Sequence, residues 1–177
     1  MRKTVILAIL AFGMGFLHAA GAQTNHLMVP QSVRYEHNNV IDRLTKEAAK
    51  PGVAAAVAQR LLVFLKAHFA KEEDFVFPPL GLLDQIAAGE MPSESVAKAA
   101  IDMATRTKAA KDELEQEHVQ IFSMADELIQ AATRAAEPDL RAFASDVAAH
   151  SLQETEILQP ATIMIGEYLK AKSFHGQ

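Results

Sequence analysis

Apolar residues recur at steps of three and four positions along most of this chain, which is the period of an amphipathic α-helix. No segment alternates apolar and polar residues with the β-branched enrichment that strands show. Prolines separate the periodic stretches, because a proline is tolerated where a helix opens but disrupts its interior. The pattern predicts four main helices, at about residues 31–49, 53–76, 94–135 and 138–158.

The remaining segments are predicted to be short. Residues 80–92 form a connector with one short helix at about 82–88. Ser93 suits the N-cap of the third helical stretch, whose alanine-rich repeats leave open whether it is one helix or two. Pro160 is expected to kink or end the fourth helix, and a tail helix is expected to follow to about residue 172.

Six polar residues interrupt the apolar stripes of these helices. In the first and third helices, a single histidine stands between apolar residues one turn away on either side. In the second and fourth helices, a histidine and a glutamate occupy successive stripe positions, and the same registers place Phe75 and Ile157 inward. The six residues, all predicted to face the interior, are His37, His68, Glu72, His118, His150 and Glu154.

The six residues form two copies of one pattern. His37 is followed 31 residues later by His68, and His118 is followed 32 residues later by His150. Each later histidine begins a His-x3-Glu motif, and a proline stands six residues after each glutamate. A single His-x3-Glu is weak evidence of a site, because such pairs are common on helix surfaces. A repeated set at matching spacing is not expected by chance.

Buried glutamates need compensation for their charge. An ionised carboxylate without a partner costs several kcal/mol in an apolar interior, and two that face each other also repel unless one is protonated. Two divalent metal ions would neutralise both carboxylates and bind the imidazole nitrogens. The alternative for any single inward histidine is a hydrogen-bonded core residue, and the repeat favours metal binding over that alternative.

Charged residues beside these positions are predicted to be solvated. Glu36 and Glu117 precede the leading histidines, so they point about 100° away around the helix. They could orient an imidazole of a neighbouring helix, but exposure to solvent is the favoured interpretation. Lys71, Glu73 and Asp74 are likewise predicted to form a solvated face.

The first 22 residues have the pattern of a cleaved signal peptide. Arg2 and Lys3 precede an apolar run from Thr4 to Leu17, and Ala-Gly-Ala at 20–22 offers a cleavage site. The run is short for a membrane span, so an uncleaved anchor is the less favoured alternative. The mature protein is expected to be residues 23–177, one domain that is periplasmic or secreted.

Composition excludes several classes of partner and site. Without its first 22 residues the chain carries 15 Lys and Arg against 22 Asp and Glu, a formal net charge of −7, with no basic cluster. Nucleic acid and anionic membranes are therefore unexpected partners. The lack of cysteine excludes disulfides, thiolate metal sites and iron–sulfur clusters. His26 and His175 lie near the chain ends and are not predicted to be ligands.

The motifs resemble those of the hemerythrin-like, or HHE cation-binding, domain family over about residues 31–160. The resemblance is carried by Glu36-His37, His68-x3-Glu72-Glu73 with Phe77-Pro78, Glu117-His118 and His150-x3-Glu154. It implies an all-α, up-down-up-down four-helix bundle, here with a short extra helix at the C-terminus. It also implies a centre of two iron ions. The implied terminal ligands are His37, His68, His118 and His150, and the implied bridging carboxylates are Glu72 and Glu154.

The chain departs from the oxygen-carrying hemerythrins in one respect. Those proteins have a fifth histidine one turn from the third-helix histidine, whereas Leu114 and Phe122 flank His118 here. Four nitrogens and two bridging carboxylates supply eight donor atoms, against about twelve positions around two six-coordinate metals. Water, hydroxide or a small exogenous ligand would fill the remainder, and reversible oxygen carriage is therefore put in doubt.

The sequence leaves several functions open. The favoured one is a module that binds or senses dioxygen or another diatomic such as nitric oxide. The alternatives are a di-iron oxidoreductase acting on peroxide or nitric oxide, an iron storage or delivery protein, and a metal-free helical interaction protein. Imidazole and carboxylate ligands suit iron, manganese or zinc, and the resemblance favours iron. No obvious acid–base group stands beside the predicted ligands, which weighs against an elaborate enzyme.

Overall fold

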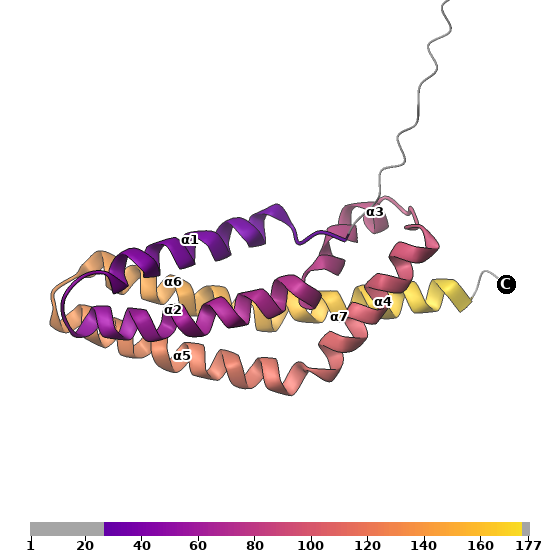
Figure 1. Ribbon diagram of the computed structural model, residues 1–177. Helices are drawn as coiled ribbons and strands as arrows, with labels where there is room; N and C mark the ends of the chain where they lie inside the picture. The colour runs from indigo at the N-terminus through magenta and orange to yellow at the C-terminus, as the bar shows by residue number, and fades with distance from the viewer. Residues whose placement is uncertain (1–26, 175–177) are drawn as a thin grey trace, which may run out of the picture.

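The computed structural model describes residues 27–174, and every regular element in that range is helical (Figure 1). Successive bundle helices run in opposite directions, and each packs against the next. The predicted all-α, up-down-up-down four-helix bundle is therefore confirmed. The predicted signal peptide, His26 and His175 lie outside the described residues. The four bundle helices are α1 (Gln31–Ala48), α2 (Val53–Lys71), α5 (Lys111–Arg134) and α6 (Pro138–Gln153).

One end of the bundle is closed by two short turns. Gly52, between α1 and α2, has φ +109°, a conformation that residues with a Cβ rarely adopt. Ala136, between α5 and α6, has φ 55°. The apolar stripes of the four helices meet behind these turns, and Leu44, Leu61 and Leu128 are fully buried there. Burial of this kind supplies the main driving force for the bundle.

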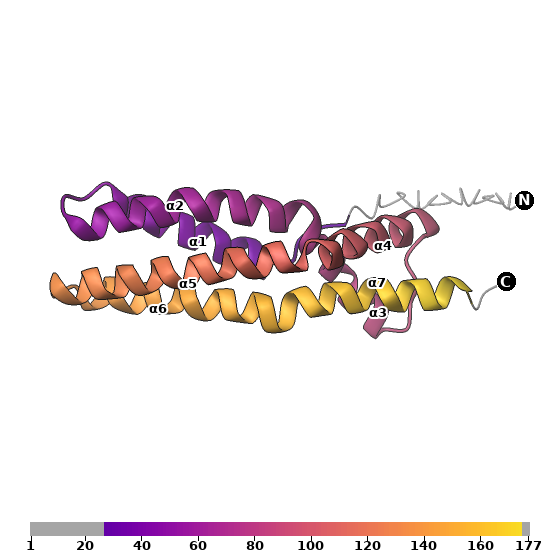
Figure 2. The same ribbon diagram turned by 90° about the horizontal axis from the view of Figure 1, so that it is seen from below.

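A second, smaller layer covers the other end of the bundle. The connector forms a 3-10 turn, η2 (Pro78–Leu82), and then α3 (Leu83–Ala87). Next, α4 (Glu94–Ala109) packs along α7 (Gln159–Phe174), and Figure 2 shows α7 continuing the line of α6. The third predicted stretch is therefore two helices, which part at Ala110. The predicted tail helix is present.

Two π-helical segments, which the sequence pattern does not predict, lie between the bundle and the second layer. They are η1 (Glu72–Val76) and η3 (Glu154–Leu158), and each begins at a predicted glutamate ligand. A π turn is wider than an α turn, so it shifts the faces of the residues that follow. Ile157, predicted to point inward, is 59% exposed, whereas Phe75, its counterpart in η1, is covered by α4 and only 3% exposed. Pro160 does not end the helix, because it follows the break that the π turn makes in the regular hydrogen-bond ladder.

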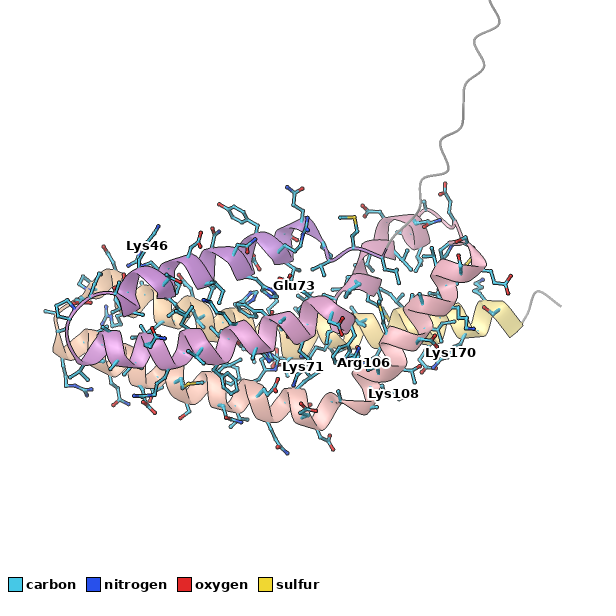
Figure 3. The ribbon with its side chains drawn as sticks, in the orientation of Figure 1. Lys46, Lys71, Glu73, Arg106, Lys108 and Lys170 are labelled. Carbon is cyan, nitrogen blue, oxygen red and sulfur yellow. The ribbon has the colours of Figure 1, made fainter. Side chains whose placement is uncertain are left out.

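The second layer holds the backbone of η1 directly. Thr107 of α4 donates a hydrogen bond to the Phe75 carbonyl (3.3 Å), and Thr162 of α7 donates one to the Val76 carbonyl (2.8 Å). The guanidinium of Arg106 lies 3.8 Å from the centre of the Phe75 ring, on the α4 face seen in Figure 3. These contacts satisfy carbonyls at the wide turn and keep Phe75 buried. The segment that begins with Glu72 is thus anchored from two helices.

Residues 53–76 are, within the described chain, long and apolar enough to cross a membrane by length and composition alone. In the structure this segment packs against α1 on one side and α5 on the other. Its apolar composition is accounted for by its place in the core, where Leu61, Leu65 and Val76 are fully buried.

We expect Gly166→Ala to destabilise the protein, although alanine is the better helix former by about 1 kcal/mol. A Cβ at Gly166 would lie 2.3 Å from the Cβ of Ala104, so α4 and α7 would have to separate, at a cost of about 1–3 kcal/mol. In an Ala104→Gly background the same change should become stabilising. Urea denaturation of the four proteins of this cycle measures both signs, and a stabilising Gly166→Ala in the wild type would contradict the close packing.

Candidate metal centre

The six predicted side chains converge inside the bundle, at the end that adjoins the second layer. His37 comes from α1, His68 from α2, His118 from α5 and His150 from α6, while the two glutamates begin η1 and η3. Five of the six side chains are at most 2% exposed, and that of His150 is 10% exposed. The centre is therefore enclosed on nearly every side by the apolar core.

Two imidazoles are oriented by carboxylates of the neighbouring helix pair. His37 Nδ1 donates a hydrogen bond to Glu73 (2.8 Å). His68 Nδ1 donates one to Glu117 (2.8 Å), and Lys71 in turn donates to Glu117. These bonds set each ring so that Nε2, and not Nδ1, points into the centre. A hydrogen bond from the far nitrogen also makes Nε2 a stronger electron donor, as is common for metal-bound histidines.

The other two imidazoles are oriented by different kinds of acceptor. His150 Nδ1 lies 3.2 Å from a carboxylate oxygen of Glu36 across the α1–α6 interface. His118 Nδ1 donates to the backbone carbonyl of Leu114 on its own helix (2.9 Å). All four Nε2 atoms are therefore directed toward one volume, each from a separate helix.

Glu154 stands between the histidine pairs with one oxygen toward each. Its Oε1 lies 3.0 Å from His37 Nε2 and 2.9 Å from His150 Nε2. Its Oε2 lies 3.4 Å from His118 Nε2. Two ligands at right angles on one divalent cation are about 3 Å apart, so these separations suit shared coordination.

Glu72 repeats this arrangement from the opposite side. Its Oε1 lies 3.3 Å from His68 Nε2 and 3.8 Å from His118 Nε2, and its Oε2 lies 3.7 Å from His37 Nε2. Neither oxygen has a hydrogen-bond partner although the side chain is fully buried. Leaving such a group unsatisfied is costly, and nearly all buried polar atoms in proteins are paired. The unpaired carboxylate is the clearest sign that a group is to be bound here.

The charges of the centre are unbalanced without a cation. Burial, and then repulsion by Glu154, raise the pKa of Glu72 well above 4.5. Burial alone would also raise the pKa of Glu154, but hydrogen bonds from His118, His150 and His37 hold it well below 4.5. Against the effect of burial, the neighbouring Glu154 raises the pKa of His150. Without a metal ion, the raised pKa values of Glu72 and His150 favour protonation, which reduces the negative charge of the centre. Cations between the carboxylates would reduce that charge in the same way.

The centre contains two groups of potential metal ligands that share Glu154. His68 and His118, with Glu72 and Glu154, offer ligand atoms that lie within 4.8 Å of one another, and all four residues are buried. His37 and His150, with Glu154, form a second group that meets the same limit. Phe69 stacks on His37 with ring centres 3.8 Å apart, and Phe77 lies beside it at 6.1 Å. Both phenylalanines are buried core residues, and they hold the imidazole in place.

The prediction for the charged neighbours of the centre was incomplete. Glu36, Glu117 and Glu73 were expected to be solvated, and Glu36 is 52% exposed, but each of the three also contacts an imidazole of another helix. Lys71 is also part of this network through Glu117. The repeated Glu-His pairs at 36–37 and 117–118 carry a signal for two of these carboxylates. Glu73 has no counterpart in the second copy, and only the packing of α1 against α2 reveals it.

Comparison with known families agrees with the geometry of this centre. The sequence model of the hemerythrin HHE cation binding domain matches residues 31–162, which include all six converging residues. Comparisons with the curated proteins and with the solved structures found no significant match. The family match covers well over half of the chain and ends two residues after Pro160. The chain therefore belongs to the hemerythrin HHE cation binding domain family.

Proposed function

We propose that this protein binds two iron ions in the bundle and takes up dioxygen, or another diatomic such as nitric oxide, at that centre. The observation that carries the proposal is the fully buried carboxylate of Glu72, whose two oxygens have no partner and each face imidazole nitrogens. A core that only needed packing would contain an apolar residue there, because an unpaired buried charge is strongly destabilising.

Each proposed ligand has a definite task. His68 and His118 would hold one ion and His37 and His150 the other, through Nε2 atoms that their outer partners direct into the centre. Glu72 and Glu154 would bridge the ions, since each directs one oxygen toward each histidine pair. Nitrogen and oxygen donors without sulfur suit iron, with manganese and zinc as alternatives.

The donor set leaves room for an exogenous ligand. Four imidazole nitrogens and four carboxylate oxygens make eight donor atoms, fewer than the roughly twelve that two six-coordinate ions accept. Leu114 and Phe122 flank His118 along α5 and cannot ligate, so a fifth histidine is not available on that helix. Iron with open positions supplies reversible binding and redox chemistry, while the chain's own residues orient the ligands and exclude bulk water.

We also propose that the protein is exported before it acts. Arg2, Lys3, the apolar run from Thr4 to Leu17 and the small residues at 20–22 support a cleavable signal peptide. The described residues begin at Leu27, so removal of residues 1–22 would leave every described helix intact. The amino-terminal sequence of the protein recovered from its native cell would start at Gln23 if the proposal is right.

We expect the purified wild-type protein to contain about two iron ions per chain, and Glu72→Ala and Glu154→Ala each to lose most of that metal. Glu36→Ala should retain near-full occupancy at saturating iron and lose about 10- to 100-fold in affinity, because it removes an orienting carboxylate and not a ligand. Metal analysis and anaerobic titration with ferrous iron measure these quantities. Equal losses in all three variants would contradict the bridging roles.

Reduced wild-type protein should develop a new charge-transfer absorption band when dioxygen or nitric oxide is added. Withdrawal of the gas should reverse the change if the centre binds the ligand without turning it over. Sustained consumption of peroxide or nitric oxide would instead identify an oxidoreductase. A colourless protein that contains zinc would overturn the redox function and leave only the cation site.

Metal-free protein should show opposite effects of two similar substitutions. The folded-state pKa of Glu72 lies above its unfolded value, so its contribution to stability falls as pH rises from about 4.5 through the folded pKa. Glu72→Gln should therefore raise the free energy of unfolding at pH 7.5, by on the order of 1 kcal/mol or more. Glu154, with its lowered pKa, contributes stability at that pH, and Glu154→Gln should reduce it.

Urea denaturation in the presence of a chelator, between pH 5 and 8, measures both effects. The wild type should lose stability across this range relative to Glu72→Gln. Loss of stability in Glu72→Gln at pH 7.5 would show that the carboxylate belongs to a satisfied structural network, and would count against a site built for cations.

A further inference from the structure

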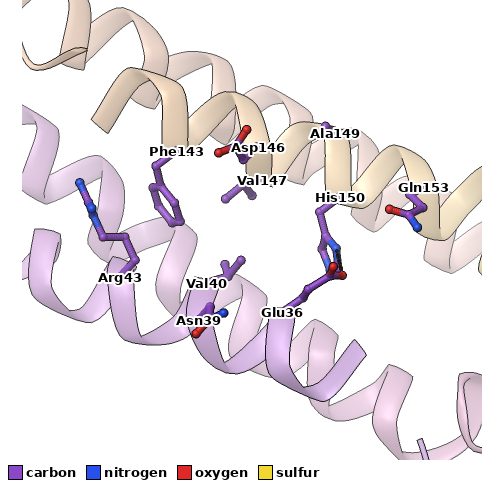
Figure 4. A pocket seen from close by; sticks show the side chains of 10 residues that line it. All are labelled: Glu36, Asn39, Val40, Arg43, Phe143, Asp146, Val147, Ala149, His150 and Gln153. Atoms are coloured by element: carbon purple, nitrogen blue, oxygen red, sulfur yellow. Dashed lines mark ion pairs between the residues drawn. The ribbon is translucent and has the colours of Figure 1, made fainter. Parts of the chain in front are cut away.

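The bundle is open along one of its four sides. Within residues 27–174, α1 packs on α2, α2 on α5 and α5 on α6, but α1 and α6 have almost no close backbone approach. A cavity of about 530 Å³ lies between these two helices and opens to solvent (Figure 4). Its lining residues come from both: Glu36, Asn39, Val40, Arg43, Phe143 and Val147 are among them.

The internal repeat explains why this side is open while its counterpart is closed. Aligning His37 with His118 and His68 with His150 sets the α1–α6 interface against the α2–α5 interface. At the latter, Phe64 and Met124 pack on the core beside Leu65 and Ile121. The matching residues of the open side are smaller or charged, so they do not fill the space: Asp146, Arg43, Val147 and Val40.

The inner end of the cavity reaches the centre at one residue. His150 is the only one of the six converging residues that lines the cavity. It is also the most exposed of them, at 10% for the side chain, against 2% or less for the others. Glu36, which contacts His150 Nδ1 at the cavity wall, is half exposed. His150 is therefore the most solvent-accessible of the six converging residues.

The walls of the cavity are suited to uncharged molecules. Val40, Val147 and Phe143 form an apolar surface. The positive charge of Arg43 is paired with Glu47, to which its Nε donates a hydrogen bond (2.9 Å), and its guanidinium lies 5.6 Å from the centre of the Phe143 ring. Glu36 and Asp146 carry negative charge and would repel anions. A neutral diatomic meets neither a charge barrier nor a large desolvation cost on this path.

We propose that the opening between α1 and α6 is the route by which small uncharged ligands reach the metal centre, and that they arrive at the side held by His150. The proposal rests on the proposed function for the presence of metal, but the route itself is a property of the chain. Asn39 and Asp146 flank the opening on opposite helices.

The absence of cysteine makes a selective block of this route possible. Asn39→Cys places a thiol on the cavity wall, and a bulky pyrene maleimide attached there would fill the opening. Asn38→Cys is a matched control, because Asn38 is the same residue type, is also exposed, and points about 100° away around α1. Each variant is compared with itself before and after labelling, so a defect caused by the substitution cannot imitate the effect, and the label at position 38 controls for disruption by the label itself.

Two measurements test the block. In anaerobic stopped-flow experiments, labelled Asn39→Cys loaded with ferrous iron should bind nitric oxide at least tenfold more slowly than before labelling, and labelled Asn38→Cys within twofold of its unlabelled rate. In the metal-free protein, diethyl pyrocarbonate should modify His150 faster than His37, His68 or His118, and only the label at position 39 should slow this. Peptide mass spectrometry assigns the modified histidine.

The outcomes separate the two proposals. Unchanged nitric oxide and His150 modification rates after labelling at position 39 would overturn the route. Equal slowing by both labels would also overturn it, because the effect would not depend on the opening. If the wild type binds no metal, the proposed function fails, yet selective protection of His150 in the metal-free protein still decides whether the opening leads to the centre.

Discussion

Two carboxylates held in one buried volume are the constraint on which this molecule depends. Glu72 and Glu154 are fully buried, each lies near three of the four imidazoles, and only Glu154 has hydrogen bonds to them. Such an arrangement is unfavourable for a core that serves packing alone. It becomes favourable when cations occupy the space between the oxygens, so stability and metal binding are linked at this point. The outer carboxylates then have a clear purpose, because they keep the imidazole lone pairs directed inward.

The backbone changes its geometry where the constraint is greatest. Both glutamates begin π-helical segments, and wide turns of this kind often occur at functional sites. At η1 the second layer satisfies the backbone, because the hydroxyls of Thr107 and Thr162 donate hydrogen bonds to the carbonyls of Phe75 and Val76 within the wide turn. The layer formed by α4 and α7 therefore contributes directly to the geometry of the centre. It holds the helix end that carries Glu72, and close packing at Gly166 keeps the two helices together.

The two copies of the repeat are alike inside and different outside. The inner positions hold the same histidines and glutamates, but Glu73 corresponds to Thr155, and Thr155 bonds to the Ser151 carbonyl. His118 therefore relies on a backbone carbonyl where His37 has a carboxylate. The two proposed metal positions are unequal in the partners of their imidazoles and in their distance from solvent. Such inequality lets one side of a centre receive ligands while the other stays enclosed.

The bundle and its six inward residues follow from the sequence, because burial at a helical period depends on local spacing and the repeat occurs twice. What surrounds them does not. Glu73 reaches His37 from a helix that is adjacent only after folding, and Glu36 reaches His150 over a distance of more than a hundred residues in the chain. The π turns, the exposed Ile157 and the opening between α1 and α6 depend on how side chains of different helices fill space. Periodicity describes one helix at a time, so these features were decided by packing between helices.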